Sequence, residues 1–233
     1  MKFEGKKQEN KYYLGYKIWP LLKDFLYPKR CVSCGKIDTF LCEKCEKEII
    51  LVSDKKCLFC GRIMDKRVCD KCRKEFRVKN GVAYCYYREG PVKNIVWNLK
   101  FRGKKELAQV MAEKIKLLPN LENFVLVPVP LDKKRFRERG YNQSFLIAKH
   151  LAFESNLKTK DCLRKESRKP QMDLKKKDRQ KNLEGAYTVI GEVPKKVILV
   201  DDVLTTGSTI KECVKVLKKA GAREVVVAVF ARD

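Results

Sequence analysis

The sequence predicts an α/β protein in which a mostly parallel sheet flanked by helices follows a small cysteine-rich module. From residue 80 onward, short apolar runs alternate with segments of helical periodicity, which is typical of a parallel sheet covered on both faces. Residues 29–79 instead carry four Cys-x2-Cys pairs and few large apolar side chains. We therefore expect bound metal to replace an apolar core in that segment.

Strands and helices are expected in alternation along residues 80–233. The expected strands are 82–87, 124–127, 186–190, 197–200 and 224–230. The expected helices are 91–99, 106–117, 141–153 and 209–220, and Gly221 ends the last one. Residues 158–181 hold 11 basic and 4 acidic residues. We expect them to form a long mobile loop, of which 168–179 can close over a ligand.

The first 28 residues are expected to form a polar leader, 1–13, and a short amphipathic helix, 14–28. The leader lacks the apolar core of a signal peptide, and no apolar run approaches the roughly 18–20 residues that span a bilayer. A cytoplasmic location is therefore expected, with the helix packed on the protein or lying on the inner face of the membrane. The predicted domains are 1–28, 29–79 and 80–233.

The charge balance is strongly basic. The chain has 54 Lys and Arg against 29 Asp and Glu, a formal net charge of +25. Two Zn²⁺ ions bound by eight thiolates would lower this to about +21. Such a field favours anionic partners, namely nucleic acid, nucleotide phosphates or an acidic membrane surface. A solvated Lys-rich surface is the alternative, because Lys is spread along the whole chain.

The four Cys-x2-Cys pairs, in a chain without an export signal, indicate zinc rather than disulfides. Two pairs supply the four thiolates of one tetrahedral site, so two structural Zn²⁺ sites are expected. Neighbouring pairs give the simplest assignment, and a crossed assignment (first with third, second with fourth) stays open. A redox dithiol is the alternative, which four repeats disfavour. The predicted ligands are Cys31, Cys34, Cys42, Cys45, Cys57, Cys60, Cys69 and Cys72.

The cysteine-rich module is itself basic, with 15 basic and 8 acidic residues over 29–80. It is therefore a candidate for gripping single-stranded DNA. Phe59 and Phe76 could stack on bases, but we assign both to the small apolar core of the module. The remaining cysteines, Cys85, Cys162 and Cys213, are expected to be packing residues.

The most informative pattern follows the strand expected at 197–200. Asp201 and Asp202 come next, at the edge where open α/β sheets bind ligands, and they can accept hydrogen bonds from a ribose diol, directly or through a metal ion. Small and hydroxylated residues then lead into a helix whose N-terminus attracts phosphate. An ordinary helix cap is the alternative, but it requires neither the second carboxylate nor five such residues. The loop residues are Thr205, Thr206, Gly207, Ser208 and Thr209.

The segment 197–209 resembles the 5-phosphoribosyl-1-pyrophosphate signature of type I phosphoribosyltransferases. The resemblance implies that Asp201 and Asp202 contact the ribose hydroxyls, that residues 205–209 hold the 5-phosphate, and that Mg²⁺ accompanies the ligand. Purine-salvage members of that family carry an aspartate where this chain has Thr205. Because a threonine hydroxyl cannot act as a base at neutral pH, purine salvage is disfavoured.

Basic residues elsewhere in the chain can complete such a site. Lys100, Arg102 and Arg139 are predicted to contact pyrophosphate oxygens, since they lie at expected turns near the ligand edge. Arg135 and Arg137 are further candidates. For each of them a solvated surface charge is the alternative.

The order of motifs narrows the resemblance. Four Cys-x2-Cys pairs precede Leu-Lys-Phe-Arg-Gly at 99–103, Val-Pro-Val-Pro at 127–130 and Arg-Gly-Tyr-Asn-Gln-Ser at 139–144. Gln171 and the motif Arg-x2-Asn-Leu-x-Gly-Ala at 179–186 then lead to the segment 197–209. Over residues 19–233 this order resembles the competence protein F family. The resemblance implies the type I phosphoribosyltransferase fold and a role in DNA uptake during natural transformation or in growth on DNA.

Two classes of function follow from these observations. As an enzyme, the protein would transfer phosphoribosyl from 5-phosphoribosyl-1-pyrophosphate to an acceptor that the sequence does not indicate, by positioning and electrostatics. As a non-catalytic protein, it would bind a ribose phosphate or single-stranded DNA in the same pocket. A nucleobase phosphoribosyltransferase of salvage metabolism is a third alternative. Either of the first two could work with DNA-uptake machinery at the cytoplasmic face of the membrane.

Overall fold

The structure is a computed structural model that describes residues 28–166 and 185–233. The expected leader, nearly all of the amphipathic helix, Gln171 and the segment 168–179 lie outside the described residues. Within the described ranges, no helix combines the length and apolar character needed to cross a membrane.

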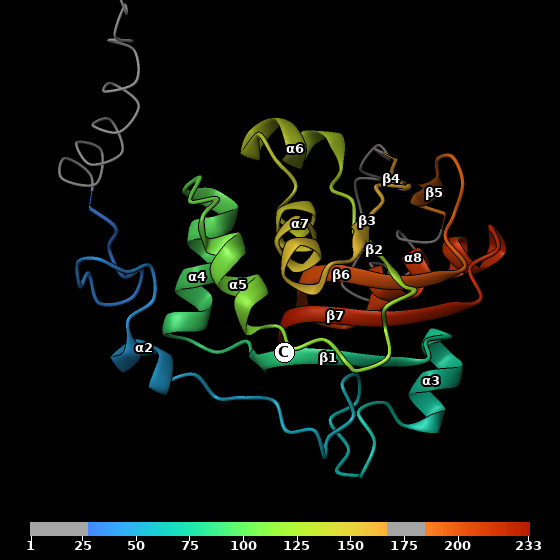
Figure 1. Ribbon diagram of the computed structural model, residues 1–233, viewed down its shortest axis with the longest axis horizontal. Helices are drawn as coiled ribbons and strands as arrows, with labels where there is room; N and C mark the ends of the chain where they lie inside the picture. The colour runs from blue at the N-terminus through green and yellow to red at the C-terminus, as the bar shows by residue number, and fades with distance from the viewer. Residues whose placement is uncertain (1–27, 167–184) are drawn as a thin grey trace, which may run out of the picture.

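A five-stranded sheet forms the centre of the protein (Figure 1). All four strand pairings are parallel, which confirms the predicted class. The two central strands are almost continuously apolar, because both of their faces are covered. In spatial order the strands are β1 (Asn80–Tyr86), β7 (Glu224–Arg232), β6 (Lys196–Leu204), β2 (Val125–Pro128) and β3 (Lys158–Thr159).

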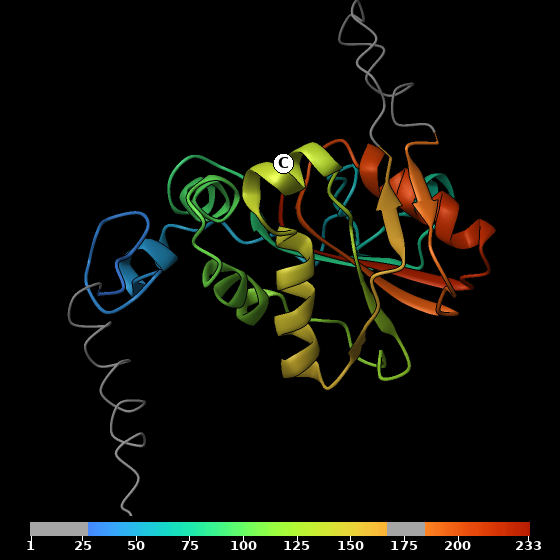
Figure 2. The ribbon, with the colours of Figure 1, turned by 90° about the horizontal axis from the view of Figure 1, so that it is seen from above.

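The sheet separates two apolar cores. Alternate residues of β6 face opposite sides, so that Ile198 and Val200 belong to one core while Val197 and Leu199 belong to the other. The first core is closed by α4 (Pro91–Phe101), α5 (Leu107–Lys114) and α7 (Gln143–Ser155), and the second by α8 (Ser208–Lys219). Figure 2 shows α7 and α8 on opposite sides of the sheet.

Three local predictions are wrong. Strand β6 does not end at residue 200 but continues through Asp201 and Asp202 to Leu204, because β7 extends beside it as far as Arg232. Residues 158–165 are not all loop, since they contain β3 and also β4 (Leu163–Lys165), which pairs antiparallel with β5 (Tyr187–Val189). Helix α6 (Lys133–Arg139) was not predicted, and its lack of buried residues explains why no apolar periodicity revealed it.

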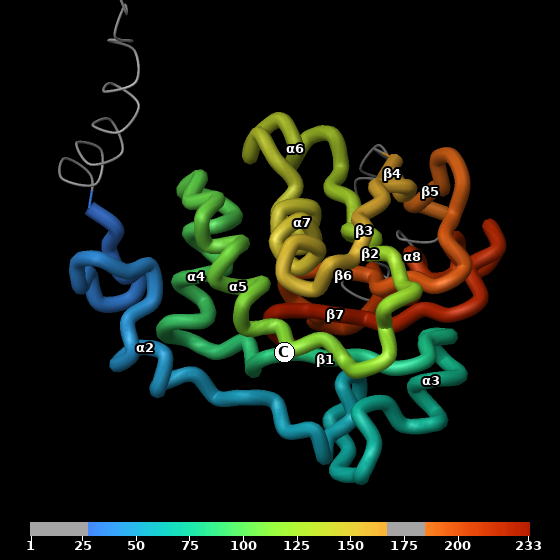
Figure 3. Tube along the Cα trace, viewed as in Figure 1, coloured from blue at the N-terminus to red at the C-terminus, as the bar shows by residue number. Residues whose placement is uncertain are grey.

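The cysteine-rich segment forms two small modules at different places on the domain. The first module, residues 29–48, includes α2 (Glu43–Lys47) and lies beside α4 and α5, where Glu46 pairs with Lys114. The second module, residues 55–76, includes α3 (Asp70–Phe76) and lies against β1 and α8. In the tube of Figure 3 the chain runs from α2 along one side of the molecule to reach α3.

Candidate functional site

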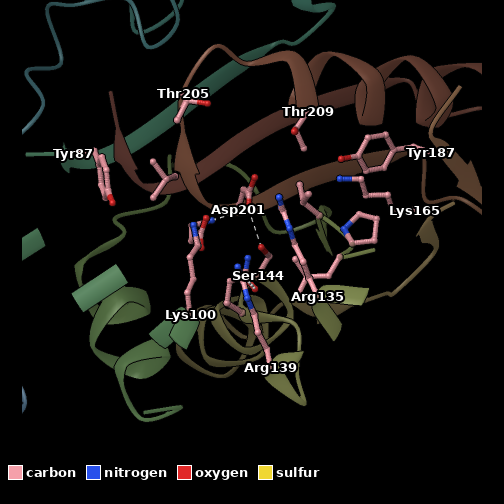
Figure 4. Close-up of a pocket in the computed structure, with 16 residues that line it drawn as sticks. Tyr87, Lys100, Arg135, Arg139, Ser144, Lys165, Tyr187, Asp201, Thr205 and Thr209 are labelled. Carbon is pink, nitrogen blue, oxygen red and sulfur yellow. Dashed lines mark hydrogen bonds and ion pairs between the residues drawn. The ribbon is translucent and has the colours of Figure 1, made fainter. Parts of the chain in front are cut away.

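A cavity of about 280 Å³ opens at the carboxyl ends of β2 and β6, the edge at which parallel sheets bind ligands (Figure 4). Residues from four helices and from five strands or their ends converge on it. Six of the ten predicted contact residues line it, namely Lys100, Arg139, Asp201, Asp202, Thr205 and Thr209. The other lining residues are Tyr87, Val129, Pro130, Leu131, Arg135, Gln143, Ser144, Lys165, Tyr187 and Val203.

Asp201 is held in place from two directions. The hydroxyl of Ser144, at the start of α7, donates to Asp201 Oδ1 at 2.8 Å, and the backbone N–H of Asp202 donates to the same oxygen at 2.9 Å. Burial raises the pKa of Asp201 to about 7, and the neighbouring charge of Asp202 adds to this, while Lys100 and the Ser144 hydroxyl oppose it. The carboxyl therefore changes its charge near neutral pH.

Asp202 lies in the cavity wall, where its charge is balanced by Lys100. Its side chain is 5% exposed, and Lys100 Nζ lies 2.9 Å from its Oδ2. That approach is an ion pair without the angle of a hydrogen bond, so Oδ2 has no hydrogen-bond partner among the described residues. A carboxylate oxygen has two lone pairs, so besides this ion pair it can accept a hydrogen bond from a ligand donor such as a sugar hydroxyl. Lys100 thus neutralises the carboxylate at the cavity wall.

The loop between β6 and α8 divides its residues among the cavity, the exposed surface and the interior. Thr205 and Thr209 line the cavity, whereas the hydroxyls of Thr206 and Ser208 lie 2.9 Å apart and bond to each other. Gly207 is the N-cap of α8, with a φ of 75°, and is buried. Its positive φ explains why glycine occupies this position. The start of α8 therefore lies at the cavity, where its N–H groups favour an anion.

The charge of the cavity is net positive. Four cationic side chains, Lys100, Arg135, Arg139 and Lys165, face two carboxylates. Arg139 is oriented by Gln143, whose Oε1 accepts from its Nη1 at 3.0 Å. Burial and the charge of Arg135 lower the pKa of Lys165 below its usual range, and Asp132 opposes this. The excess of positive charge suits a ligand with several phosphate groups.

Sequence reasoning missed some cavity residues and misplaced others. Lys165 and Tyr187 enter from the β4–β5 pair, and no local pattern links these short strands to the sheet edge. Arg102 does not line the cavity, since its guanidinium lies 4.8 Å from the centre of the Trp97 ring. Arg137 lines a neighbouring cavity with Phe136 instead.

An aromatic and basic surface flanks the cavity on α4. Trp97 and Phe101 are 42% and 61% exposed, and their ring centres lie 6.1 Å apart. Arg102 covers Trp97, and the guanidinium of Arg139 lies 5.1 Å from the centre of the Phe101 ring. We call Trp97, Phe101 and Arg102 the α4 patch. Exposed aromatic rings interleaved with cations form the kind of surface on which unpaired bases stack.

The eight module cysteines form two clusters, each made from neighbouring pairs and not from crossed ones. Within each cluster the sulfur atoms lie within 4.8 Å of one another. Sγ distances of 3.5 Å for Cys34–Cys42 and 3.8 Å for Cys60–Cys69 suit a tetrahedral ion with Zn–S bonds of about 2.3 Å. Burial alone would raise the pKa of Cys57, but N–H donors from Cys60, Cys69 and Phe59 lower it to about 7, which favours the metal-binding thiolate.

Comparisons with known proteins agree with this architecture. The Phosphoribosyl transferase domain family matches residues 142–233, and the Double zinc ribbon domain family matches residues 22–73. We therefore call residues 29–48 and 55–76 the first and second ribbons.

Curated relatives share most of the chain. Competence protein F of Haemophilus influenzae is 29% identical over 227 residues, covering 87% of this chain and 96% of that protein. Competence protein ComFC of Bacillus subtilis is 28% identical over 215 residues, covering 82% of this chain and 83% of that protein. DNA utilization protein YhgH of Salmonella typhi is 31% identical over 157 residues, covering 61% of this chain and 67% of that protein. With a double zinc ribbon in front of a phosphoribosyl transferase domain, this chain belongs to the competence protein F family.

Proposed function

We propose that the cavity binds 5-phosphoribosyl-1-pyrophosphate together with Mg²⁺. The observation that carries this proposal is the adjacent pair of carboxylates, Asp201 and Asp202, in a cavity that also has four cations and a helix N-terminus. Asp201 and Asp202 accept hydrogen bonds from the ribose hydroxyls. The start of α8 holds the 5-phosphate, and Arg135 and Arg139 bind the pyrophosphate.

The same residues fit a divalent cation that arrives with the ligand. Mg²⁺ prefers oxygen ligands and is commonly bound by one or two carboxylates plus phosphate oxygens, a donor set that Asp201 and Asp202 can complete. When bound, the ion neutralises the departing pyrophosphate. Transfer of the phosphoribosyl group to an acceptor then rests on how this chain orients the sugar and stabilises charge around it.

A second candidate function is binding of single-stranded DNA, and the α4 patch favours it. Its exposed rings lie next to the cavity. Arg139 connects the two, because its guanidinium lies over the Phe101 ring and its side chain also lines the cavity. Relatives named for competence and for DNA utilization support a role in DNA uptake or growth on DNA. We propose that this role is exercised in the cytoplasm, at the inner face of the membrane and next to the DNA-uptake machinery. A non-catalytic ribose-phosphate binder would use the same surfaces.

Salvage of a nucleobase is the least supported alternative. Thr205 lines the cavity where a purine-salvage enzyme carries an aspartate, and its hydroxyl does not ionise near neutral pH.

We further propose that Zn²⁺ occupies both four-cysteine clusters and has a structural role. Each cluster is closed by four thiols, which is the arrangement of structural rather than catalytic zinc. We also propose a domain division at residues 79 and 80, because β1 begins at Asn80.

Calorimetry with 5-phosphoribosyl-1-pyrophosphate and Mg²⁺ tests the ligand. The Asp201→Ala plus Asp202→Ala protein is expected to lose binding while keeping its zinc content. Glu192→Ala, which removes a carboxylate that is 90% exposed, serves as the control and binds normally. Unchanged binding in the double variant contradicts the proposal. Asp202→Asn is the milder variant should the double one not fold.

Pyrophosphate release separates an enzyme from a binding protein. The wild-type protein is incubated with the ligand, Mg²⁺ and candidate acceptors, single-stranded DNA among them. Release that depends on one acceptor supports phosphoribosyl transfer. Tight binding without release under any condition supports the non-catalytic alternative.

A further inference from the structure

The loop that we assign to the 5-phosphate is supported from behind by an aromatic ring of the second ribbon. A Cβ atom at Gly207 would lie 2.6 Å from Cε1 of Phe76 and 3.0 Å from its Cζ. Phe76 is only 8% exposed, so its ring is packed against the loop backbone rather than held in solvent. The side chain that fixes the position of the loop therefore comes from a segment about 130 residues away in the sequence.

Phe76 is in turn tied to the second cysteine cluster. It follows Cys72 by four residues on α3, so the ligand and the ring share one face of that helix. Phe59, between Cys57 and Cys60, stacks on Phe76 with ring centres 4.0 Å apart and planes 18° apart. A Cβ at Gly207 would also lie 3.5 Å from Phe59. Metal bound by this cluster would therefore fix both ends of a two-ring stack that packs against the loop.

Other contacts hold the second ribbon against the domain at the same place. Leu58 packs so closely on β1 that a Cβ at Gly81 would lie 2.4 Å from its Cδ2. Arg232, at the end of β7, donates from Nη1 to the carbonyl of Cys57 at 3.0 Å. Lys211 on α8 pairs with Glu75 on α3 at 3.1 Å. The ribbon is therefore fixed to β1, β7 and α8 together.

The first ribbon has no comparable access to the site. Its buried cysteines, Cys31, Cys42 and Cys45, form a cluster of their own, and its polar contacts reach α4 and α5 through Asn94 and Lys114. Among the described residues, none of the first ribbon lines the cavity. The two clusters have the same four-cysteine chemistry, but only the second lies behind the loop.

We propose that Phe76, stacked on Phe59, is a positioning residue for the loop 205–209, to which we assign the 5-phosphate. Metal in the second cluster is what gives Phe76 this role. The identity of the phosphate ligand rests on the function proposed above, whereas the mechanical coupling does not. When the second cluster loses its metal, the small ribbon loses the element that replaces its core. The loop then gains freedom, and a ligand must order it at a cost in affinity.

The first experiment measures loop order directly in the full chain. In Phe76→Ala, amide hydrogen exchange of residues 205–209 is expected to accelerate, while exchange in β6 and β7 stays slow. Ribose 5-phosphate, the probe ligand, is expected to bind about tenfold more weakly, a loss of about 1.4 kcal/mol. Phe40→Ala removes an aromatic ring from the first ribbon and is the matched control, which changes neither quantity.

The outcomes separate a positioning role from a merely structural one. Phe76→Leu keeps apolar contact with the loop and is expected to restore most of the affinity. Unchanged loop exchange in both Phe76 variants overturns the proposal, as does acceleration spread evenly over the whole sheet. If the loop loosens as expected but the wild-type protein does not bind ribose 5-phosphate, the proposed function fails and the coupling stands.

The second experiment compares the two clusters. Cys60→Ser and Cys34→Ser each remove one exposed ligand from equivalent positions, and each is expected to lower zinc content by one ion per chain. Only Cys60→Ser is expected to accelerate exchange at residues 205–209 and to weaken ribose 5-phosphate binding. Equal effects of the two variants on the loop, or no effect of Cys60→Ser despite lost zinc, overturn the proposal.

Discussion

The first and second ribbons contain the same arrangement of cysteines, yet they are attached to the domain in different ways. The buried cysteines of the first ribbon form a small cluster of their own. Those of the second belong to one continuous core with α8 and with residues of β6 and β7. A metal motif read from the sequence therefore does not say what the metal supports. Its structural role depends on the surface against which the module packs.

The largest expected effect tests whether the ribbons differ in what they stabilise. Cys72→Ser removes a buried ligand from the second cluster and Cys45→Ser removes its counterpart from the first. We expect Cys72→Ser to lower the free energy of unfolding of the phosphoribosyl transferase domain by about 4 kcal/mol, or the melting temperature by about 8–16 °C. Cys45→Ser should affect mainly its own ribbon. Calorimetric melting of both variants measures this, and equal losses would remove the distinction.

A glycine pair sharpens the comparison at the backbone. Gly35 of the first ribbon and Gly207 both have positive φ, 80° and 75°, but a Cβ at Gly35 meets nothing within 4 Å whereas one at Gly207 meets Phe76. Gly35→Ala should therefore cost about 1–2 kcal/mol for the backbone conformation alone. Gly207→Ala should cost a further 1–3 kcal/mol or so for the collision. Denaturant unfolding compares the two, and similar costs would argue that Phe76 does not press on the loop.

The site that the second ribbon supports also contains a charge that is costly to bury. The pKa of Asp201 is raised from its ordinary 3.8 to about 7, so its stabilising contribution is complete below pH 4 and is lost as the pH rises through 7. Asp201→Asn should therefore melt at a higher temperature than the wild-type protein at pH 8, with little difference at pH 4. Melting curves across this range check the sign. An increase in melting temperature that does not depend on pH would have a cause other than the ionisation of Asp201.

The remaining prediction concerns the α4 patch, which lies on the side of the first ribbon. Trp97→Ala should weaken single-stranded DNA binding by about 1–3 kcal/mol, the contribution of one stacked base. Phe153→Ala, which removes a ring that is 90% exposed on α7, is the control. Fluorescence anisotropy at fixed salt gives both affinities. If neutralising second-ribbon cations weakens DNA binding more than removing Trp97 does, the DNA-binding surface lies on the second ribbon instead.

Much of this arrangement could be predicted from the sequence because its signals are local. Apolar runs predicted the strands of the sheet, and the spacing of the cysteines predicted a metal-binding module. Asp201 and Asp202 are adjacent in the sequence, and both line the cavity. Apolar periodicity does not reveal polar elements, since α6 buries no residue and β6 continues through two aspartates.

The features that could not be predicted depend on contacts between residues far apart in the sequence. Lys165 and Tyr187 reach the cavity from a strand pair that depends on tertiary packing. Phe76 was correctly assigned to a core, but the sequence gives no sign that this core includes Gly207. Arg102 and Lys100 are separated by one residue, yet one covers Trp97 and the other pairs with Asp202. Lys100 lies on α4, whereas Arg102 is the residue that caps the end of that helix, so their side chains take different directions.

The order of strands has a consequence for biosynthesis. Strand β1, on which the second ribbon rests, pairs along its length with β7, so that Asn80 lies beside Val226. A ribosome releases the ribbon long before it has made either Gly207 or β7. The nascent second ribbon can therefore bind its metal early. The apolar side chains of Leu58 and Phe76, however, are not fully covered until Gly207 and β7 have been synthesised. Zinc supply during translation should accordingly influence how much of the protein escapes aggregation.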